Sequence, residues 1–236
     1  MQLYLSSYKI GKQKQILVEM IGKRKIALIP NSIDIKSDDP NVNPRTRLIS
    51  LNDDIKELES LGIEVEVLDL RKYFGKKEEL EAKLNEFGGV YVRGGNSFLL
   101  RKAFNESGFD EILKVKLSDT EFVYAGYSAG VVVLSDTLKG IDIVDDPNIK
   151  VEGYKDGIIW EGLGIIKYSV APHYDPNWRT NEKRHPESEK IEETVQYFEA
   201  NGIKYVAMRD GEVIVRDNSG KETFYRLEGN NTGPEK

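Results

Sequence analysis

The stretch Phe122-Val123-Tyr124-Ala125-Gly126-Tyr127-Ser128-Ala129-Gly130 decides how this 236-residue chain folds. An apolar run leads into Gly-x-Ser-x-Gly, and a second apolar run, 131–134, follows it. This order is typical of a nucleophile elbow, in which a strand ends, the chain turns sharply and a helix begins. Glycine on each side leaves room for strand and helix to approach closely. The pattern predicts that the Ser128 hydroxyl stands on the turn as a candidate nucleophile.

Strand and helix patterns alternate around the elbow. Buried strands are predicted at 25–30, 65–70, 89–92, 122–125, 165–170 and 205–208, and helices with apolar residues at helical spacing at 48–61, 77–85, 97–103, 110–117 and 186–201. Such alternation predicts an α/β fold with a mostly parallel central sheet flanked by helices. Asp210-Gly211 predicts a turn through which 213–215 pairs back on 205–208 as a C-terminal β-hairpin. We expect residues 1–228 to form a single domain and 229–236 a frayed tail.

Composition excludes several classes of function. The 34 Lys and Arg residues against 40 Asp and Glu residues give a net charge of −6, which argues against a nucleic-acid partner. The absence of cysteine excludes disulfides, thiolate metal sites and a cysteine nucleophile. No apolar stretch is long enough to span a bilayer and no signal peptide is evident, so we expect a cytoplasmic protein without a membrane partner. Neither a metal nor another cofactor is expected, and the oligomeric state stays open.

A serine hydroxyl needs a nearby base, and the base needs an orienting acid. The chain has two histidines, and His173 follows a predicted strand end, which is where open α/β sheets place their sites. We therefore expect His173 to be the base and His185, among charges before a helix, to be solvated. Asp210 lies at another strand end and is a candidate acid. Spacing does not distinguish it from three aspartates between the serine and the histidine, Asp142, Asp145 and Asp146.

A second glycine-rich turn, Gly94-Gly95-Asn96, lies between a predicted strand and a predicted helix. Its backbone offers N–H donors at the same edge of the sheet as the elbow. The N–H of Gly95 and that of Ala129 would together make a two-donor oxyanion hole, each donor contributing roughly 3–4 kcal/mol to the transition state.

Four segments in this order give the chain a resemblance to the dipeptidase E (aspartyl dipeptidase) family of serine peptidases, whose relatives include cyanophycinase. They are Val92-Arg93-Gly94-Gly95-Asn96-Ser97-Phe98-Leu99-Leu100, Gly126-Tyr127-Ser128-Ala129-Gly130, Gly162-Leu163-Gly164 and Ala171-Pro172-His173-Tyr174. The resemblance spans most of the chain. It implies a fold like that of class I glutamine amidotransferases, with serine in place of the amidotransferase cysteine.

The resemblance also implies an activity and a set of site residues. It implies hydrolysis of short peptides through an acyl-enzyme, with the triad Ser128, His173 and Asp210, and with Asp142 as the nearest match to a further aspartate of such enzymes. Gly95 and Ala129 match the oxyanion-hole positions. Asn96, Arg179 and Arg184 are candidates for substrate contact.

One feature of the family is not matched. The aspartate-specific members are thought to bind the substrate's acidic side chain with an arginine after the histidine loop, where this chain has Pro186-Glu187-Ser188-Glu189. Arg179 and Arg184 lie nearby, but neither aligns without a shift. The resemblance therefore implies peptidase chemistry, and it leaves the side-chain preference, including cleavage after an N-terminal aspartate, open.

Two other interpretations stay open at the level of sequence. An esterase of the α/β-hydrolase type would use the order Ser128, Asp142, His173, although that fold usually places its histidine near the C-terminus. Alternatively, an amidotransferase-like scaffold can serve as a ligand-binding domain without catalysis, since a fold does not fix a function.

Overall fold

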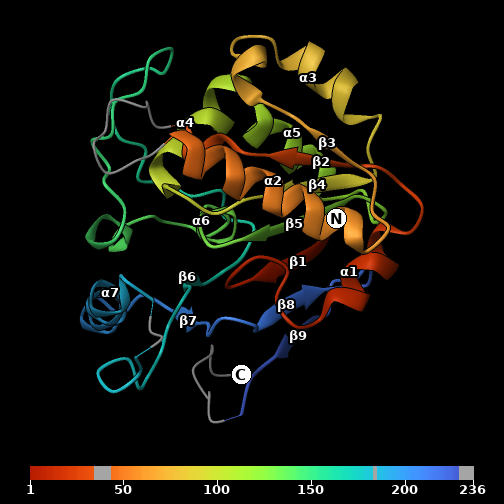
Figure 1. The fold of residues 1–236 in the computed structure, drawn as a ribbon. Coiled ribbons are helices and arrows are strands. Elements are labelled where there is room, and N and C mark those ends of the chain that lie inside the picture. Colours follow the sequence, from red (N-terminus) through yellow and green to blue (C-terminus); the bar gives the residue numbers. More distant parts are fainter. Residues whose placement is uncertain (35–43, 183–184, 229–236) are drawn as a thin grey trace.

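A seven-stranded sheet forms the centre of the molecule in the computed structural model, which describes residues 1–34, 44–182 and 185–228 (Figure 1). The strands lie in the order β3-β2-β4-β5-β1-β8-β9. Five of them run parallel, and β8 and β9 are antiparallel to their neighbours. Their bounds are β1 Gln2–Ser6, β2 Ile26–Ile29, β3 Val65–Val67, β4 Gly89–Val92, β5 Val123–Tyr127, β8 Val213–Arg216 and β9 Glu222–Tyr225.

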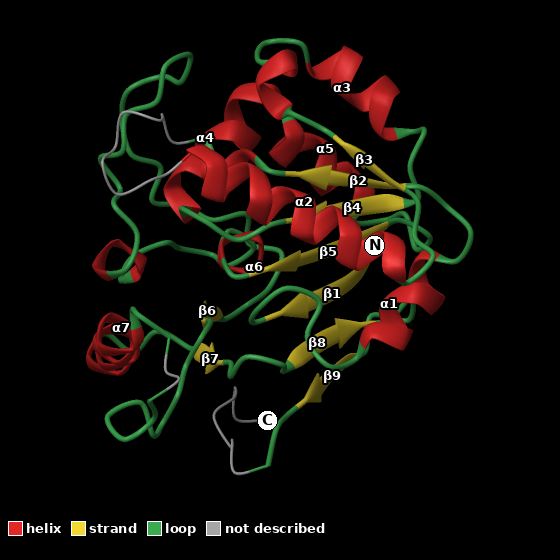
Figure 2. Cartoon of the chain, in the orientation of Figure 1, coloured by secondary structure: helices red, strands yellow, loops and turns green. Residues whose placement is uncertain are grey.

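Helices cover both faces of this sheet (Figure 2). Apolar side chains of α3, α4 and α5 pack with those of the strands in one core, and those of α1 and α2 pack in a second core on the opposite face. Because both faces are covered, every residue of β2, β4 and β5 is buried, as parallel sheets require. The helices are α1 Lys14–Ile21, α2 Pro44–Ser60, α3 Lys77–Leu84, α4 Ser97–Ser107, α5 Phe109–Lys116, α6 Ala129–Val132 and α7 Ser188–Ala200. Single 3₁₀ turns occur at η1 Asn31–Ile33, η2 Leu70–Tyr73 and η3 Ile141–Ile143.

Two short strands, β6 Ser169–Ala171 and β7 Tyr205–Ala207, form a separate parallel pair. Helix α7 connects them, and its apolar face packs against them in a third core. This pairing corrects one prediction, because Asp210-Gly211 does not close a hairpin between 205–208 and 213–215. The chain instead leaves β7 at this point and joins the main sheet, where β8 pairs with β1. The C-terminal hairpin is formed by β8 and β9, across the turn Asn218-Ser219-Gly220.

The fold confirms the single α/β domain with a mostly parallel sheet, and it differs from the prediction in details near the site. Strand β1 was not predicted, yet it lies between β5 and β8. The helix after the elbow has only four residues, and residues 165–168 bend before β6 begins. The predicted tail, 229–236, lies outside the described residues. Within the described ranges, no helix combines the length and apolar character that crossing a membrane would need.

Candidate active site

Ser128 lies on the turn between β5 and α6 with its backbone in a strained conformation, φ 50° and ψ −118°. A non-glycine residue rarely adopts a positive φ, and such strain is often found at functional sites. The flanking glycines make the turn possible: a Cβ on Gly126 would lie 3.0 Å from the Val92 carbonyl oxygen, and one on Gly130 would collide with the same atom. The local geometry therefore agrees with the predicted elbow.

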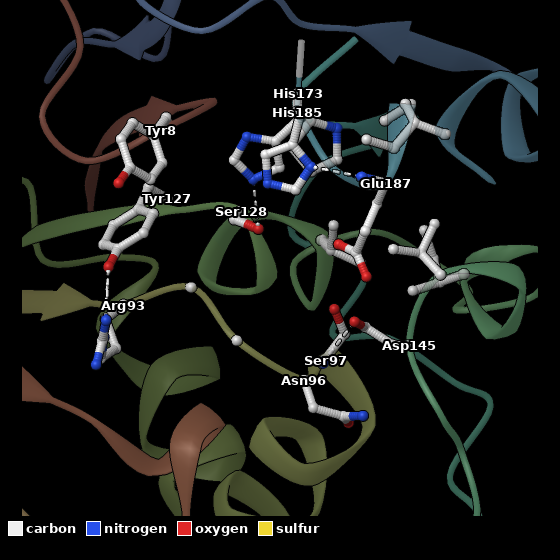
Figure 3. Close-up of a pocket in the computed structure, with 18 of the residues that line it drawn as sticks. Tyr8, Arg93, Asn96, Ser97, Tyr127, Ser128, Asp145, His173, His185 and Glu187 are labelled. Carbon is white, nitrogen blue, oxygen red and sulfur yellow. Dashed lines mark hydrogen bonds between the residues drawn. The ribbon is translucent and has the colours of Figure 1, made fainter. Parts of the chain in front are cut away.

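A continuous chain of hydrogen bonds starts at this serine, and Figure 3 shows its first bond, between Ser128 and His173. The distance from Ser128 Oγ to His173 Nε2 is 3.1 Å, and that from His173 Nδ1 to Asp210 Oδ1 is 2.8 Å. The three residues come from the ends of β5, β6 and β7. Burial raises the pKa of the Asp210 carboxyl, but the hydrogen bond and charge of His173 outweigh it, with help from Ser7, so that the pKa lies below its ordinary value. Asp210 is therefore ionised at neutral pH and favours a proton on His173 Nδ1.

Ser7, at the end of β1, connects the two distant parts of this chain of bonds. Its Oγ accepts the backbone N–H of His173 at 2.8 Å, and its hydroxyl proton lies within reach of Asp210 Oδ1 at 2.8 Å and the Met208 carbonyl at 3.1 Å. His173 has φ 59°, so its backbone also needs support from its surroundings. Sequence reasoning missed Ser7, because no pattern in the N-terminal segment indicated that β1 ends beside the histidine.

His185 is not solvated as the sequence suggested. Its ring stacks on that of His173, with centroids 4.3 Å apart and planes 11° from parallel. Burial, followed by the field of His173, lowers the pKa of His185 below its ordinary value. Tyr8 contacts the His173 ring edge-on from another direction, at a centroid distance of 5.8 Å. The imidazole of His173 is thus enclosed by two rings.

The two predicted N–H donors flank the serine. Ala129 follows it directly, and Gly94 is so close that a Cβ there would lie 2.8 Å from Ser128 Cβ. Gly95 has φ 148°, and a Cβ there would lie 2.6 Å from the Ser32 carbonyl oxygen, so only glycine fits without a shift. In the part of the chain that the structure describes, neither the Gly95 nor the Ala129 N–H has a hydrogen-bond partner. Gly95 lines the cavity described below, whereas Ala129 is buried directly behind Ser128.

A cavity of about 560 Å³ opens beside Ser128. Lys9 and the buried Arg93 line one side, where Asp54 pairs with Arg93 at 3.1 Å. The opposite side carries three carboxylates, those of Asp145, Asp146 and Glu187. Figure 3 shows Arg93 and Tyr127 on one side of Ser128 and Asp145 and Glu187 on the other. The described cavity wall therefore has more negative than positive side chains.

Asp145 holds an unusual position on this wall. Its Oδ2 accepts the backbone N–H of Ser97 at 2.8 Å, at the first turn of α4. Burial raises the pKa of the Asp145 carboxyl to about 6, although the Ser97 hydrogen bond lowers it and the charge of Glu187 raises it further. This carboxyl is close to half-ionised in slightly acidic solution.

Two other predicted site residues, Asp142 and Arg179, do not line the cavity, and a third lies outside the described residues. Asp142 is exposed and accepts the N–H of Gly140 at 3.0 Å, with no contact to His173. Arg179 pairs with Glu192 at 2.8 Å and does not line the cavity. Arg184 lies outside the described residues.

Asn96 does line the cavity, but both ends of its side-chain amide are already engaged. Its Oδ1 caps α4 by accepting the Leu99 N–H at 2.9 Å, and its Nδ2 donates to the Asp146 carbonyl at 2.9 Å. The described residues contain no group of three His, Cys, Asp or Glu side chains arranged to hold a metal ion.

Known proteins resemble this chain over most of its length. A model described as Peptidase family S51 matches residues 12–224. An uncharacterised peptidase of Listeria monocytogenes is 31% identical over 120 residues, which cover 51% of this chain and 55% of that protein. Peptidase E of Streptomyces coelicolor is 31% identical over 134 residues, which cover 55% of this chain and 49% of that protein. The matches thus span about half the length of these curated relatives.

The fold is also found in solved structures. A crystal structure of a peptidase E candidate from Listeria monocytogenes EGD-e superimposes with a TM-score of 0.70, covering 96% of this chain and 98% of that one at 22% identity. At this identity the likeness supports the fold alone.

Proposed function

Since this chain belongs to peptidase family S51, we propose that it is a serine peptidase that hydrolyses short peptides through a Ser-His-Asp triad. In this proposal Ser128 is the nucleophile, His173 the general base and Asp210 the orienting acid. One observation carries it: the unbroken line of hydrogen bonds from Ser128 Oγ through the His173 ring to Asp210, at 3.1 and 2.8 Å.

In the proposed reaction, Nε2 of His173 first accepts a proton and then donates it, once in each half of the reaction. Nε2 takes the proton of Ser128 Oγ as the oxygen attacks the scissile carbonyl carbon. The imidazolium then donates that proton to the leaving amine, the C–N bond breaks, and an acyl-enzyme remains. Water, deprotonated by the same nitrogen, attacks the ester carbon, the C–O bond to Ser128 breaks, and the imidazolium returns its proton to Ser128 Oγ as the acid leaves. The ionised Asp210 stabilises the imidazolium in both halves of the reaction.

The N–H groups of Gly95 and Ala129 are the proposed oxyanion donors. Support comes from their place beside Ser128 and from their lack of partners within the described residues. Donors that are fixed before the reaction stabilise the charge that develops on the carbonyl oxygen in the transition state.

The cavity supports a short substrate. A volume of about 560 Å³ is in the range of pockets for small molecules, which corresponds to a few amino-acid residues. We further propose that an N-terminal aspartate is not required. Among the described side chains that line the cavity, three are carboxylates and two are cations, Lys9 and Arg93, and Arg93 is already paired with Asp54. An additional acidic side chain would meet more repulsion than attraction there.

The test is turnover of a dipeptide and tripeptide panel by the wild type, Ser128→Ala and Ser118→Ala. Ser118 is an exposed serine distant from the cavity lining and serves as the matched control. We expect Ser128→Ala to lose at least a thousandfold in kcat and Ser118→Ala to match the wild type. Unchanged turnover by Ser128→Ala would remove the proposal. A protein that only binds ligands would show no turnover in any variant.

A further inference from the structure

The acid beside His173 is unusually open to solvent. The Asp210 side chain is 45% exposed, whereas that of His173 is only 10% exposed. A hydrogen bond to a partly exposed carboxylate competes with water. Asp210 orients His173 through Nδ1, and most of the contacts that enclose the faces and edges of the ring come from other residues.

The broadest of these contacts is the parallel stack with His185, at 4.3 Å and 11°. The stacking ring is itself anchored. Its Nδ1 accepts the N–H of Glu187 at 3.2 Å, and the His185 carbonyl accepts both the N–H and the hydroxyl of Ser188, where α7 begins. The third core thus supports the ring through a helix that packs against β6 and β7.

A neutral His185 ring is suited to stack on His173, which becomes protonated during the proposed reaction. His185 Nδ1 is an acceptor, so the neutral ring carries its proton on Nε2. Burial and the field of His173 lower its pKa, and Asp210 is the charged group that raises it. A neutral ring beside the His173 imidazolium avoids the repulsion that two stacked cations would produce.

We infer that His185 is a positioning residue whose ring face holds the His173 imidazole in the plane where Nε2 meets Ser128 Oγ and Nδ1 meets Asp210. The inference rests on the proposed function, because a base that passes a proton from serine to a leaving amine tolerates little rotation. His185 contributes orientation and takes no proton itself.

Two variants separate the ring face from the hydrogen bond of His185. His185→Phe keeps a flat aromatic face and loses the acceptor, whereas His185→Asn keeps a side-chain acceptor and loses the face. For each we would measure kcat and KM on a peptide substrate, and the rate of Ser128 labelling by a fluorophosphonate. We expect His185→Asn to lose about tenfold in kcat and in labelling rate with KM changed less than about twofold. His185→Phe should retain kcat within about threefold of the wild type.

Two results would overturn the inference. One is full activity in His185→Asn, which would show that the ring face is dispensable. The other is an equal loss in both variants, which would assign the effect to the hydrogen bond with Glu187. Measuring Ser128→Ala in the same assays separates failure of this inference from failure of the proposed function. If Ser128→Ala is inactive and His185→Asn is fully active, only the role of the stacked ring is rejected. If Ser128→Ala is active, the proposed function is rejected.

A measurement on the wild type tests the stack without relying on the activity of the variants. The chain contains only two histidines, so the ring protons of both can be assigned by comparison with His185→Phe. At a centroid distance of 4.3 Å we expect nuclear Overhauser contacts between the two imidazole rings. Their absence in the folded wild type would show that the stack does not exist in solution and would overturn the inference.

Discussion

The Ser7 hydroxyl and the Asp210 carboxylate lie 2.8 Å apart although 203 positions separate them in the chain. The same hydroxyl oxygen accepts the backbone N–H of His173 at 2.8 Å. Ser7, which directly follows β1, therefore fixes both the carboxylate of Asp210 and the backbone of His173. His173 belongs to the loop after β6 and Asp210 to the loop after β7. Ser7 is 1% exposed, so water does not substitute for it.

Replacing Ser7 by alanine should therefore reduce activity without changing the nucleophile. The variant leaves the His173 N–H without its acceptor and Asp210 without a donor, so both can shift. We expect kcat to fall about tenfold, with Ser118→Ala unchanged as the control. The measurement is steady-state kinetics on a dipeptide, with circular dichroism to verify the fold. A Ser7→Ala enzyme with wild-type kcat would show that the two loops hold their positions without β1.

The choice of acid is tested by comparing two aspartates. Asp210→Asn removes the charge beside His173 and favours the wrong tautomer, because an amide N–H now competes to donate toward Nδ1. We expect kcat to fall at least a hundredfold. Asp142→Asn should change kcat less than about twofold. Asp142 is exposed, and within the described residues its side chain accepts one hydrogen bond, from the Gly140 N–H. The reverse order of effects would reassign the acid.

The oxyanion donor at Gly95 is tested by adding one methyl group. In Gly95→Ala the new Cβ would lie 2.6 Å from the Ser32 carbonyl oxygen, so the turn must shift and its N–H with it. We expect kcat to fall about a hundredfold with a smaller change in KM. Gly153→Ala is the control, because Gly153 has φ 87° but no atom within 4 Å of an added Cβ. It should lose about 1 kcal/mol of stability from the backbone alone and keep its kcat.

Asp145 predicts a dependence of stability on pH. Its pKa is about 6 in the folded protein and 3.8 in the absence of burial. Between these values the folded state binds more protons than the unfolded state, so this group's contribution to stability is lost as pH rises through about 6. In Asp145→Asn the stability should not fall with pH through this position, because an amide does not ionise. The amide oxygen can still accept the Ser97 N–H.

The matching measurement is urea unfolding at two pH values. We expect Asp145→Asn to raise the free energy of unfolding by about 3 kcal/mol at pH 8 and to leave it nearly unchanged at pH 3.5, relative to wild type. Asp146→Asn, at the exposed neighbouring position, should show no such difference. An Asp145→Asn variant that is less stable than wild type at pH 8 would show that the ionised carboxylate stabilises the fold.

Local patterns were enough to predict the elements nearest the chemistry. Gly126 and Gly130 flank Ser128 and indicate the elbow, because an added Cβ would be crowded by the Val92 carbonyl at Gly126 and would collide with it at Gly130. The sequence contains two histidines, so the base can only be His173 or His185 if it is an imidazole. The elbow needs glycine and the proposed base needs histidine. Because each position accepts one residue type, it can be recognised in the sequence.

Relationships across the sheet could not be predicted in the same way. Ser7 and His185 reach His173 only because β1 lies next to β5 and because α7 packs on β6 and β7, and neither arrangement leaves a signal in the local pattern. Asp210-Gly211 looked like a hairpin turn, because turn residues report backbone conformation and not which sheet the next strand joins. The choice between Asp142 and Asp210 was open for the same reason.

The central claim is that His173 activates Ser128, and labelling by a fluorophosphonate followed by peptide mass spectrometry tests it most directly. We expect a single adduct, on Ser128, in the wild type, and a labelling rate at least a hundredfold lower in His173→Ala. Equal labelling rates in the two proteins, or an adduct on another residue of an enzyme that still turns over peptides, would contradict the claim.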